Sequence, residues 1–171
     1  LRIAIIGAGP AGLYAAYLLK RAHPDFDIRL IEQNPPSATF GFGVVFSSQA
    51  LSFLHEDDPE THDAIVPHME RWDDITLNHG GEQVRIDGIG FSAIGRLHLL
   101  QLLQARADLV GVTPAWKQRV DSIDEVEDAD IIIGADGLNS VVRGASPDVF
   151  GEEMEELENR FVWYGARGEF D

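Results

Sequence analysis

Residues 2–12 read Arg2-Ile3-Ala4-Ile5-Ile6-Gly7-Ala8-Gly9-Pro10-Ala11-Gly12, and this stretch decides the fold. The apolar run before Gly7 is typical of a buried strand in a parallel sheet. Gly7 permits a tight turn, Gly9 has no side chain to keep a pyrophosphate from the backbone, and Gly12 lets the next helix lie close to the strand. This Gly-x-Gly-x-x-Gly spacing predicts a Rossmann-like dinucleotide-binding domain.

The helix after the turn and the strand after that helix support the same prediction. The helix that the turn opens runs from Ala11 to about Leu19, and its unpaired N–H groups and its dipole favour a phosphate at its start. The second strand, residues 27–31, ends at Glu32. Glu32 lies about 20 residues beyond the last glycine of the turn, where this fold places an acid that accepts a hydrogen bond from a ribose hydroxyl.

Composition limits the class of protein. The 171 residues are 44% hydrophobic and 25% charged, as in an ordinary globular domain. No apolar stretch is long enough for a bilayer span and no signal peptide is recognisable, so no membrane association is predicted. The net charge of −16 disfavours nucleic acid and anionic lipid as partners. With no cysteine, the chain cannot form a disulfide framework, a thiolate nucleophile or a Cys-ligated zinc site.

The rest of the chain predicts parallel-type units of strand and helix with one antiparallel insertion. A hairpin is expected within residues 72–91 and a buried strand at residues 131–133. Residues 39–46 fit either a plain core strand or a segment that approaches something flat, because glycines in a strand favour both. The other predicted elements are helices from Ser47 to about Leu54, from Pro59 to Arg71 and after Gly95, strands at 112–114, 119–123 and 161–165, a solvated acidic turn at 124–130, and a solvated helix face at 151–159.

Two further features suggest a second binding element. Residues 134–143 read Gly134-Ala135-Asp136-Gly137-Leu138-Asn139-Ser140-Val141-Val142-Arg143, which is again a strand end, an acidic turn and a helix start. Arg96 stands in the first turn of its helix, where the dipole opposes a cation, so an anionic partner is the simplest explanation. The six histidines show no metal-ligand spacing, and we predict surface or packed histidines and no metal site.

The two glycine turns, together with Arg96 and Leu99, resemble those of the flavin-dependent aromatic-ring monooxygenases, the group that includes para-hydroxybenzoate hydroxylase. Within that group the chain is most similar to the members that act on salicylyl-CoA or aminobenzoyl-CoA. The stretches that carry this similarity are residues 40–47, 72–75, 95–96, 136–140 and 159–165. The resemblance covers all 171 residues, but only the front portion of such an enzyme, because the family's later Gly-Asp motif is not among them. Para-hydroxybenzoate hydroxylase carries arginines in the stretch that matches residues 39–43, and their flavin contacts cannot be carried over.

The resemblance implies FAD as cofactor, NAD(P)H as reductant, and O2 and a small aromatic molecule as substrates, in a cytoplasmic enzyme. In that family NAD(P)H reduces FAD, and a C4a-hydroperoxyflavin then hydroxylates the ring. Ser140 and Arg143 would serve FAD and NAD(P)H, and no catalytic residue is assigned. The residues implied in cofactor binding are Gly7, Gly9, Pro10, Ala11, Gly12, Glu32, Gln33, Gly43, Val44, Arg96, Asp136 and Gly137.

The implied organisation is an FAD-binding domain over residues 1–171, with an inserted hairpin at about 72–91 and the start of a substrate-domain strand at about 160–166. Alternatives stay open: a hydroxylase of a tryptophan-derived or simple phenolic substrate, another enzyme on the same cofactor domain, such as a flavin halogenase or a prenyl-chain reductase, or a non-catalytic FAD-binding fragment. The three tryptophans do not form the Trp-x-Trp signature of halogenases. The exact substrate, the choice between NADH and NADPH and the oligomeric state are also left open by the sequence.

Overall fold

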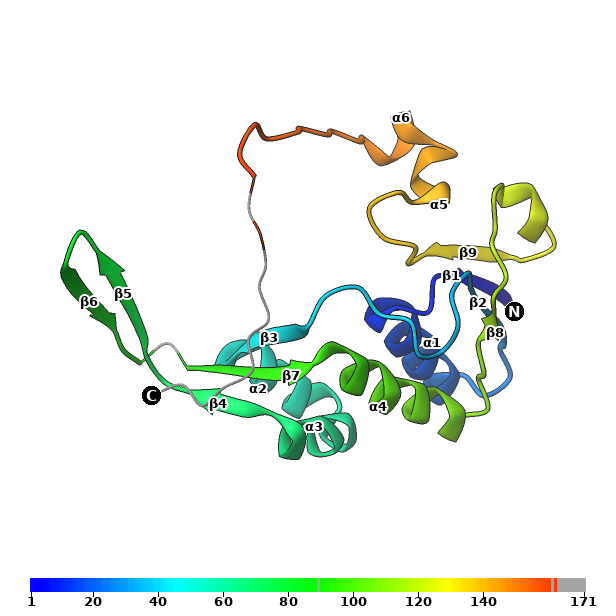
Figure 1. The fold of residues 1–171 in the computed structure, drawn as a ribbon. Coiled ribbons are helices and arrows are strands. Elements are labelled where there is room, and N and C mark those ends of the chain that lie inside the picture. Colours follow the sequence, from blue (N-terminus) through cyan, green and yellow to red (C-terminus); the bar gives the residue numbers. More distant parts are fainter. Residues whose placement is uncertain (89, 161, 163–171) are drawn as a thin grey trace.

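The computed structural model describes residues 1–88, 90–160 and 162, which form three sheets and their flanking helices (Figure 1). The strands are β1 (Arg2–Ile6), β2 (Asp27–Glu32), β3 (Gly43–Ser47), β4 (Glu70–Trp72), β5 (Ile75–His79), β6 (Glu82–Ile86), β7 (Phe91–Gly95), β8 (Ala115–Trp116) and β9 (Ile131–Gly134). The helices are α1 (Pro10–Ala22), α2 (Ser48–Asp57), α3 (Pro59–Ile65), α4 (Arg96–Leu109), α5 (Val141–Gly144) and α6 (Pro147–Phe150), with 3-10 turns η1 (Val66–His68) and η2 (Ile123–Val126).

A parallel sheet with strand order β8-β2-β1-β9 confirms the predicted Rossmann-like fold. The central strand β1 is buried from Ile3 to Ile6 because both faces of the sheet are covered. On one face Ile3 and Ile5 belong to the larger core cluster, together with residues of α1 and α4. On the other face Ala4 and Ile6 pack with residues of the segment between β8 and β9. The carboxyl ends of β1, β2 and β9 therefore meet at one edge of the sheet.

The antiparallel insertion is confirmed, and it is more extensive than predicted. Strands β5 and β6 form the hairpin, with Ile75 opposite Ile86, and it projects from the rest of the molecule in Figure 1. A second antiparallel sheet has the order β3-β7-β4. Its middle strand, β7, lies in a region for which no strand was predicted. Because Gly43 pairs with Gly95, this sheet brings the start of β3 next to the start of α4.

One predicted helix ends earlier than expected, and another does not form. The helix predicted from Pro59 to Arg71 ends at Ile65, and the chain then forms η1 and β4. Pro67 has no N–H to donate and interrupts the helix, and Glu70–Trp72 pairs with β7 instead. Residues 151–159 are exposed, as expected, but they form no helix, and the last helix among the described residues ends at Phe150. Their five glutamates repel one another, and nothing covers their few apolar side chains.

Several predicted strands also need correction. Neither residues 112–114 nor residues 119–123 form a strand, and the chain between α4 and η2 contributes only Ala115–Trp116. Strand β9 exists where predicted, but Ile131 is 45% exposed, because β9 has a neighbour on only one side within the described residues. The strand predicted at residues 161–165 lies outside the described residues, apart from Val162. On α4, Leu99, Leu103 and Ala107 are buried and Leu102 is partly buried, which gives the helix one apolar face.

A buried carboxylate anchors α1 to α3. Asp58 is fully buried, and its Oδ1 lies 2.7 Å from Nη1 of Arg21. Its Oδ2 accepts a hydrogen bond of 3.2 Å from the Tyr14 hydroxyl. Arg106 of α4 bonds to Thr61 and to Tyr17, which ties the third helix to the same network. These contacts fix the position of α1, the helix whose start carries the glycine turn.

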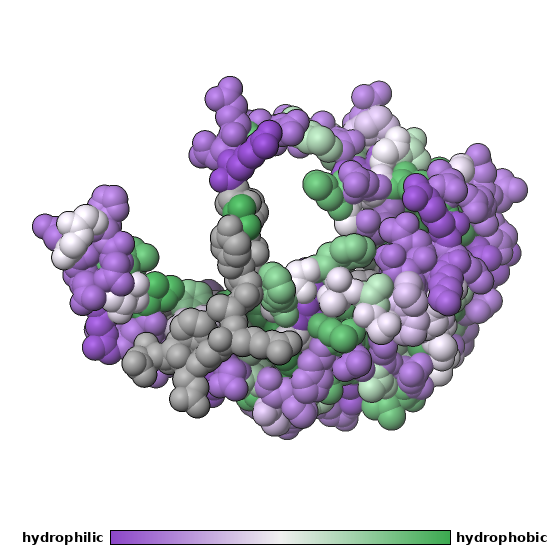
Figure 2. Space-filling model, viewed as in Figure 1, coloured by the Kyte–Doolittle hydropathy of each residue, from purple (hydrophilic) through white to green (hydrophobic). Residues whose placement is uncertain are grey.

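On the face drawn in Figure 2, hydrophilic residues cover most of the surface over the parallel sheet, and hydrophobic residues gather between that region and the hairpin. Among the described residues, no helix is both long and apolar enough to cross a membrane.

Candidate cofactor site

The first glycine turn is built by close backbone contacts. Gly7 has φ +100°, and its N–H donates a 2.8 Å hydrogen bond to the carbonyl of Ile31. A Cβ on Gly12 would lie 1.8 Å from the Gly7 carbonyl oxygen, so only glycine fits at residue 12. Around Gly9, by contrast, no atom lies within 4 Å of a built Cβ. Gly9 is therefore not required by packing within the protein, and a ligand could approach the backbone there.

The start of α1 is suited to an anion. Gly9 caps the helix without a side-chain hydrogen bond, Pro10 stands at its first position, and no acidic residue lies in the first turn. Thirteen residues of α1 align their peptide dipoles behind this end. The unpaired N–H groups of the first turn consequently favour a phosphate at the position next to Gly9.

Glu32, at the end of β2, accepts hydrogen bonds from the glycine turn and from the loop that follows β2. Its Oε2 accepts a 2.9 Å hydrogen bond from the N–H of Ala8, and its Oε1 accepts hydrogen bonds of 2.8 Å from the backbone N–H and the side-chain amide of Asn34. A carboxylate has about four lone-pair positions, so capacity for another donor is left. Glu32 thus shapes the glycine turn and still faces the cleft beside it.

The acidic turn at residues 134–137 contacts the glycine turn at residues 7–12. The N–H of Ala135 donates a 2.7 Å hydrogen bond to Ile6, and a Cβ on Gly7 would collide with the carbonyl of Ala135 at 2.4 Å. Asp136 uses Oδ2 to accept a 2.6 Å hydrogen bond from the N–H of Val141 at the start of α5. Its Oδ1 is buried and has no partner in the described part of the chain. Because such an atom is costly to leave unpaired, it is suited to a ligand hydroxyl.

A cleft of about 800 Å³ joins the two turns. It is lined by nine of the twelve predicted residues: Gly7, Gly9, Pro10, Ala11, Glu32, Gln33, Arg96, Asp136 and Gly137. Gly12 lies beneath the turn, and Gly43 and Val44 lie in β3 outside the lining. Arg96 is next to them, because its N–H donates a 3.0 Å hydrogen bond to Phe42. Within the described residues, the Arg96 guanidinium has no ion pair or hydrogen bond to protein.

Sequence reasoning missed one wall of the cleft. Gln118, Arg119 and Val120 follow the two-residue strand β8 and line the cleft beyond Glu32. The N–H of Gln118 donates a 2.9 Å hydrogen bond to the carbonyl of Glu32, which fixes this wall. Residues after the carboxyl end of a parallel strand face the ligand in such folds, so identifying β8 would have found them.

Ser140 and Arg143 lie behind the second turn and not in the cleft lining. The Ser140 hydroxyl accepts a 3.1 Å hydrogen bond from the N–H of Arg143, and it caps α5. The Arg143 guanidinium donates to the carbonyl of Leu138 and pairs with Glu152 at 2.8 Å. Both residues support the shape of the Asp136-Gly137 turn.

Comparison with known proteins agrees with this geometry. A family model described as an NAD(P)-binding Rossmann-like domain matches residues 5–41. A salicyloyl-CoA 5-hydroxylase from a Streptomyces species is 41% identical over the whole chain. A 3-hydroxy-4-methyl-anthranilyl-[aryl-carrier protein] 5-monooxygenase from Streptosporangium sibiricum is 28% identical over 97% of the chain. The solved structure of 2-methyl-3-hydroxypyridine-5-carboxylic acid oxygenase superposes with a TM-score of 0.71 at 26% identity, over 84% of this chain and 41% of that one.

The chain is similar to part of several monooxygenases that act on aromatic rings, and a further relative from Bacillus subtilis is named a putative FAD-dependent monooxygenase. The chain spans 33% of the length of the Streptomyces relative and 46% of the Streptosporangium relative. The similarity therefore concerns the part of those monooxygenases that contains the glycine turns.

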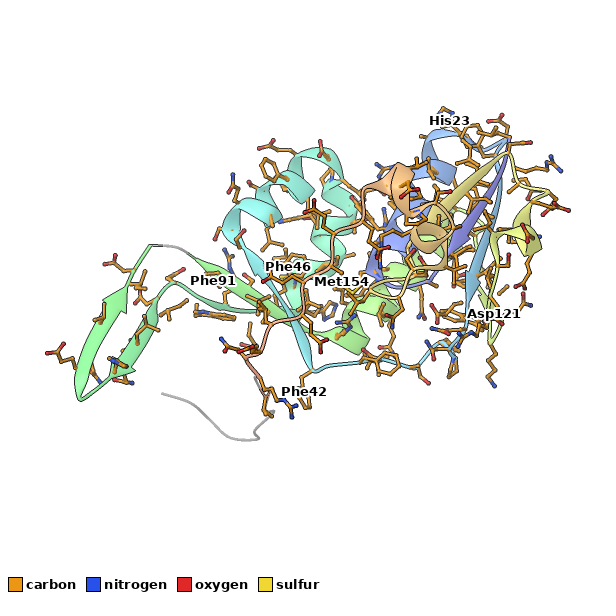
Figure 3. All side chains as sticks on the ribbon, turned by 90° about the horizontal axis from the view of Figure 1, so that it is seen from above. His23, Phe42, Phe46, Phe91, Asp121 and Met154 are labelled. Atoms are coloured by element: carbon orange, nitrogen blue, oxygen red, sulfur yellow. The ribbon has the colours of Figure 1, made fainter. Side chains whose placement is uncertain are left out.

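The side chains that line the cleft favour binding. Among the described residues the lining contains no serine, histidine, lysine, tyrosine or cysteine, and its ionisable side chains are Glu32, Arg96, Arg119 and Asp136. These residues can bind and orient a cofactor, but they form no nucleophile and base pair. One aromatic side chain, Phe40, lines the cleft. Figure 3 shows that Phe42 lies apart from Phe46 and Phe91 of the antiparallel sheet.

Proposed function

We propose that the chain binds FAD in the 800 Å³ cleft and is the cofactor-binding part of an NAD(P)H- and O2-using enzyme that hydroxylates an aromatic ring. The observation that carries the proposal is the meeting of the two glycine turns, with open space at Gly9 and an unpartnered buried oxygen on Asp136. Plain strand-and-helix packing gives no reason for the unpartnered oxygen of Asp136, which is the more specific of these features.

The residues of the cleft would bind and orient the cofactor. The N–H groups at the start of α1 would hold the pyrophosphate, and Glu32 would accept a hydrogen bond from a ribose hydroxyl. Arg96 would pair with an anionic part of the ligand, and Asp136 would accept a hydroxyl through Oδ1. When bound, reduced flavin supplies the activation of O2 for transfer to the ring. The protein's task is to place the ring and to exclude water.

The substrate we propose is an aromatic acyl thioester such as salicylyl-CoA or aminobenzoyl-CoA. Two relatives support this class, because their names specify an aryl group carried on CoA in one case and on an aryl-carrier protein in the other. The identity of 41% over the whole chain makes the CoA thioester the first choice.

Cofactor binding tests the first part of the proposal. Purified protein should bind FAD stoichiometrically in a fluorescence titration, and denaturation should release it. NAD+ added at the same concentration should not displace it. A protein that binds NAD+ and takes up no FAD would contradict the assignment of the cleft.

Substrate-stimulated NAD(P)H oxidation, followed by mass spectrometry of the product, tests the second part. The assay should use a chain as long as the monooxygenase relatives and should compare salicylyl-CoA and aminobenzoyl-CoA with free salicylate and a tryptophan derivative. We expect stimulation and hydroxylation with the thioesters. Stimulation by free acids alone would overturn the substrate class and leave the cofactor assignment standing, and no stimulation with FAD bound would favour a binding module.

A further inference from the structure

A cluster of metal-ligating side chains lies at the junction of α2 and α3, away from the cofactor cleft. His55 stands in the last turn of α2, and His62 and Asp63 stand in α3. Each offers one ligand atom, and the three atoms lie within 4.8 Å of one another. The imidazole rings of His55 and His62 are edge to face, with centroids 4.6 Å apart, and Nδ1 of His62 lies 2.9 Å from Oδ1 of Asp63.

The backbone between the two helices holds this cluster in place. The N–H of Asp58 donates a 2.9 Å hydrogen bond to Leu54 of α2, and its carbonyl accepts hydrogen bonds of 3.1 Å from the N–H groups of Thr61 and His62 in α3. The same residue is fully buried and paired with Arg21. The two helices are thus fixed relative to each other by contacts that do not involve the ligand atoms, and an ion would have little chain to order.

The donor set selects the kind of ion. Two imidazole nitrogens and one carboxylate oxygen suit Zn²⁺ and similar borderline divalent ions, whereas Ca²⁺ and Mg²⁺ prefer oxygen ligands. Three protein ligands leave a fourth position of a tetrahedral site for water. Residues 55–63 include five acidic side chains; Asp58 is paired with Arg21 and Glu60 with Arg106, which leaves three, in a chain of net charge −16, to attract a cation.

We propose that His55, His62 and Asp63 bind one Zn²⁺ ion. None of the three lines the 800 Å³ cleft, so this site is independent of the proposed cofactor function. Both α2 and α3 contribute to the wall of an apolar cavity of about 430 Å³ that reaches Pro10 and Ala11 at the start of α1. Zn²⁺ would join the two helices of that wall.

Zn²⁺ titration of chelator-treated protein against a competing dye tests the site. One ion should bind per chain. His55→Ala and His62→Ala should each weaken binding by about a hundredfold, because losing even an outer partner of a ligand costs about 10- to 100-fold. His68→Ala is the matched control: its ring lies 4.5 Å from His98, but no third ligand completes a group there among the described residues. The control should bind Zn²⁺ like the parent.

A second measurement separates lost ligation from lost folding. Zn²⁺ should raise the melting temperature of the parent and of His68→Ala but not of Asp63→Asn, which keeps both histidines and the size of the side chain. The melting curves without Zn²⁺ should be alike for the parent, Asp63→Asn and His68→Ala, whose changed side chains are exposed, whereas His62 is only 21% exposed and its removal can also cost packing. No saturable binding to the parent, binding undiminished in the His55→Ala/His62→Ala double variant, or an equal loss in His68→Ala would each overturn the proposal.

Discussion

At the scale of single residues, the glycines of the first turn have different tasks. Gly12 is required by packing, since a Cβ there would lie 1.8 Å from the Gly7 oxygen, whereas Gly9 has open space and an ordinary φ of −71°. We expect Gly12→Ala to lower the free energy of unfolding by about 1–3 kcal/mol or more. Gly9→Val should fold like the parent and lose FAD. Thermal melting and a fluorescence titration with FAD distinguish the two, and a Gly9→Val chain that fails to fold would contradict this division.

Glu32 gives a second prediction at this scale. Its carboxylate accepts three hydrogen bonds from Ala8 and Asn34, so in Glu32→Gln an NH₂ group must face at least one of these donors. We expect a loss of about 1–3 kcal/mol of stability even without cofactor, and weaker FAD binding in addition. Chemical denaturation measures the first effect. Glu127→Gln, an exposed acid with no side-chain bond among the described residues, is the control and should change neither quantity.

Most residues of the candidate site could be predicted because each follows a local rule. Glycines mark the turn, Glu32 follows the second strand, and Asp136 repeats the strand-end pattern. Gln118 and Arg119 could not be found in this way. They enter the cleft because the chain returns from α4 to pair two residues with β2, and so short a strand has no periodicity to read.

At the scale of elements, the parallel strands were predictable and the antiparallel sheet was not fully so. Strand β7 escaped prediction because its inward positions are Ser92 and Ile94, and a buried serine hides the alternation of polar and apolar residues. Helix α3, in contrast, was predicted too long. The helical pattern of the sequence continues to Arg71, but Pro67 and the pairing of β4 with β7 end the helix earlier. Tertiary pairing decided both outcomes.

Asp58 provides the prediction at the element scale. Burial alone would raise its pKa, but hydrogen bonds from Thr61 and Arg21 and the charge of Arg21 outweigh burial and hold the pKa of Asp58 below its ordinary value. A carboxyl whose pKa is lower in the folded state stabilises the fold above the unfolded pKa of about 3.9, and this contribution is lost as the pH falls through the folded value. Stability should therefore drop below about pH 4.

Asp58→Asn tests that assignment. At neutral pH it should lose about 1–3 kcal/mol, because the buried carboxylate that pairs with the partly exposed Arg21 is replaced by a neutral amide, and its stability should depend less on pH in the acid range. Urea denaturation from pH 7 to pH 2.5 measures both effects. The exposed neighbour in Asp57→Asn should leave the acid limb of the parent curve unchanged. An unchanged acid limb in Asp58→Asn would show that other carboxylates cause the drop.

At the scale of the whole molecule, apolar side chains are exposed at the cleft and on the hairpin. Phe40 and Leu138 line the cleft, yet they are 74% and 77% exposed. Leu77 and Val84 of the hairpin are about half exposed on one face. Apolar groups in such positions favour contact with further protein. Within the described residues, the phosphate turn is fully shaped and the rim of the cleft at Phe40 and Leu138 is open to solvent.

The last prediction follows from that open cleft. With FAD bound and NAD(P)H supplied, the 171-residue chain should pass its electrons to O2 and release hydrogen peroxide, because within the described residues the rim of the cleft at Phe40 and Leu138 is open to water. The measurement is hydroxylated product per NAD(P)H consumed, alongside peroxide, with salicylyl-CoA as substrate. The Streptomyces salicyloyl-CoA 5-hydroxylase, of which this chain matches 33%, is the control and should couple most of its NAD(P)H to product. An equal ratio for the two proteins would mean that the exposed rim at Phe40 and Leu138 already forms the complete site.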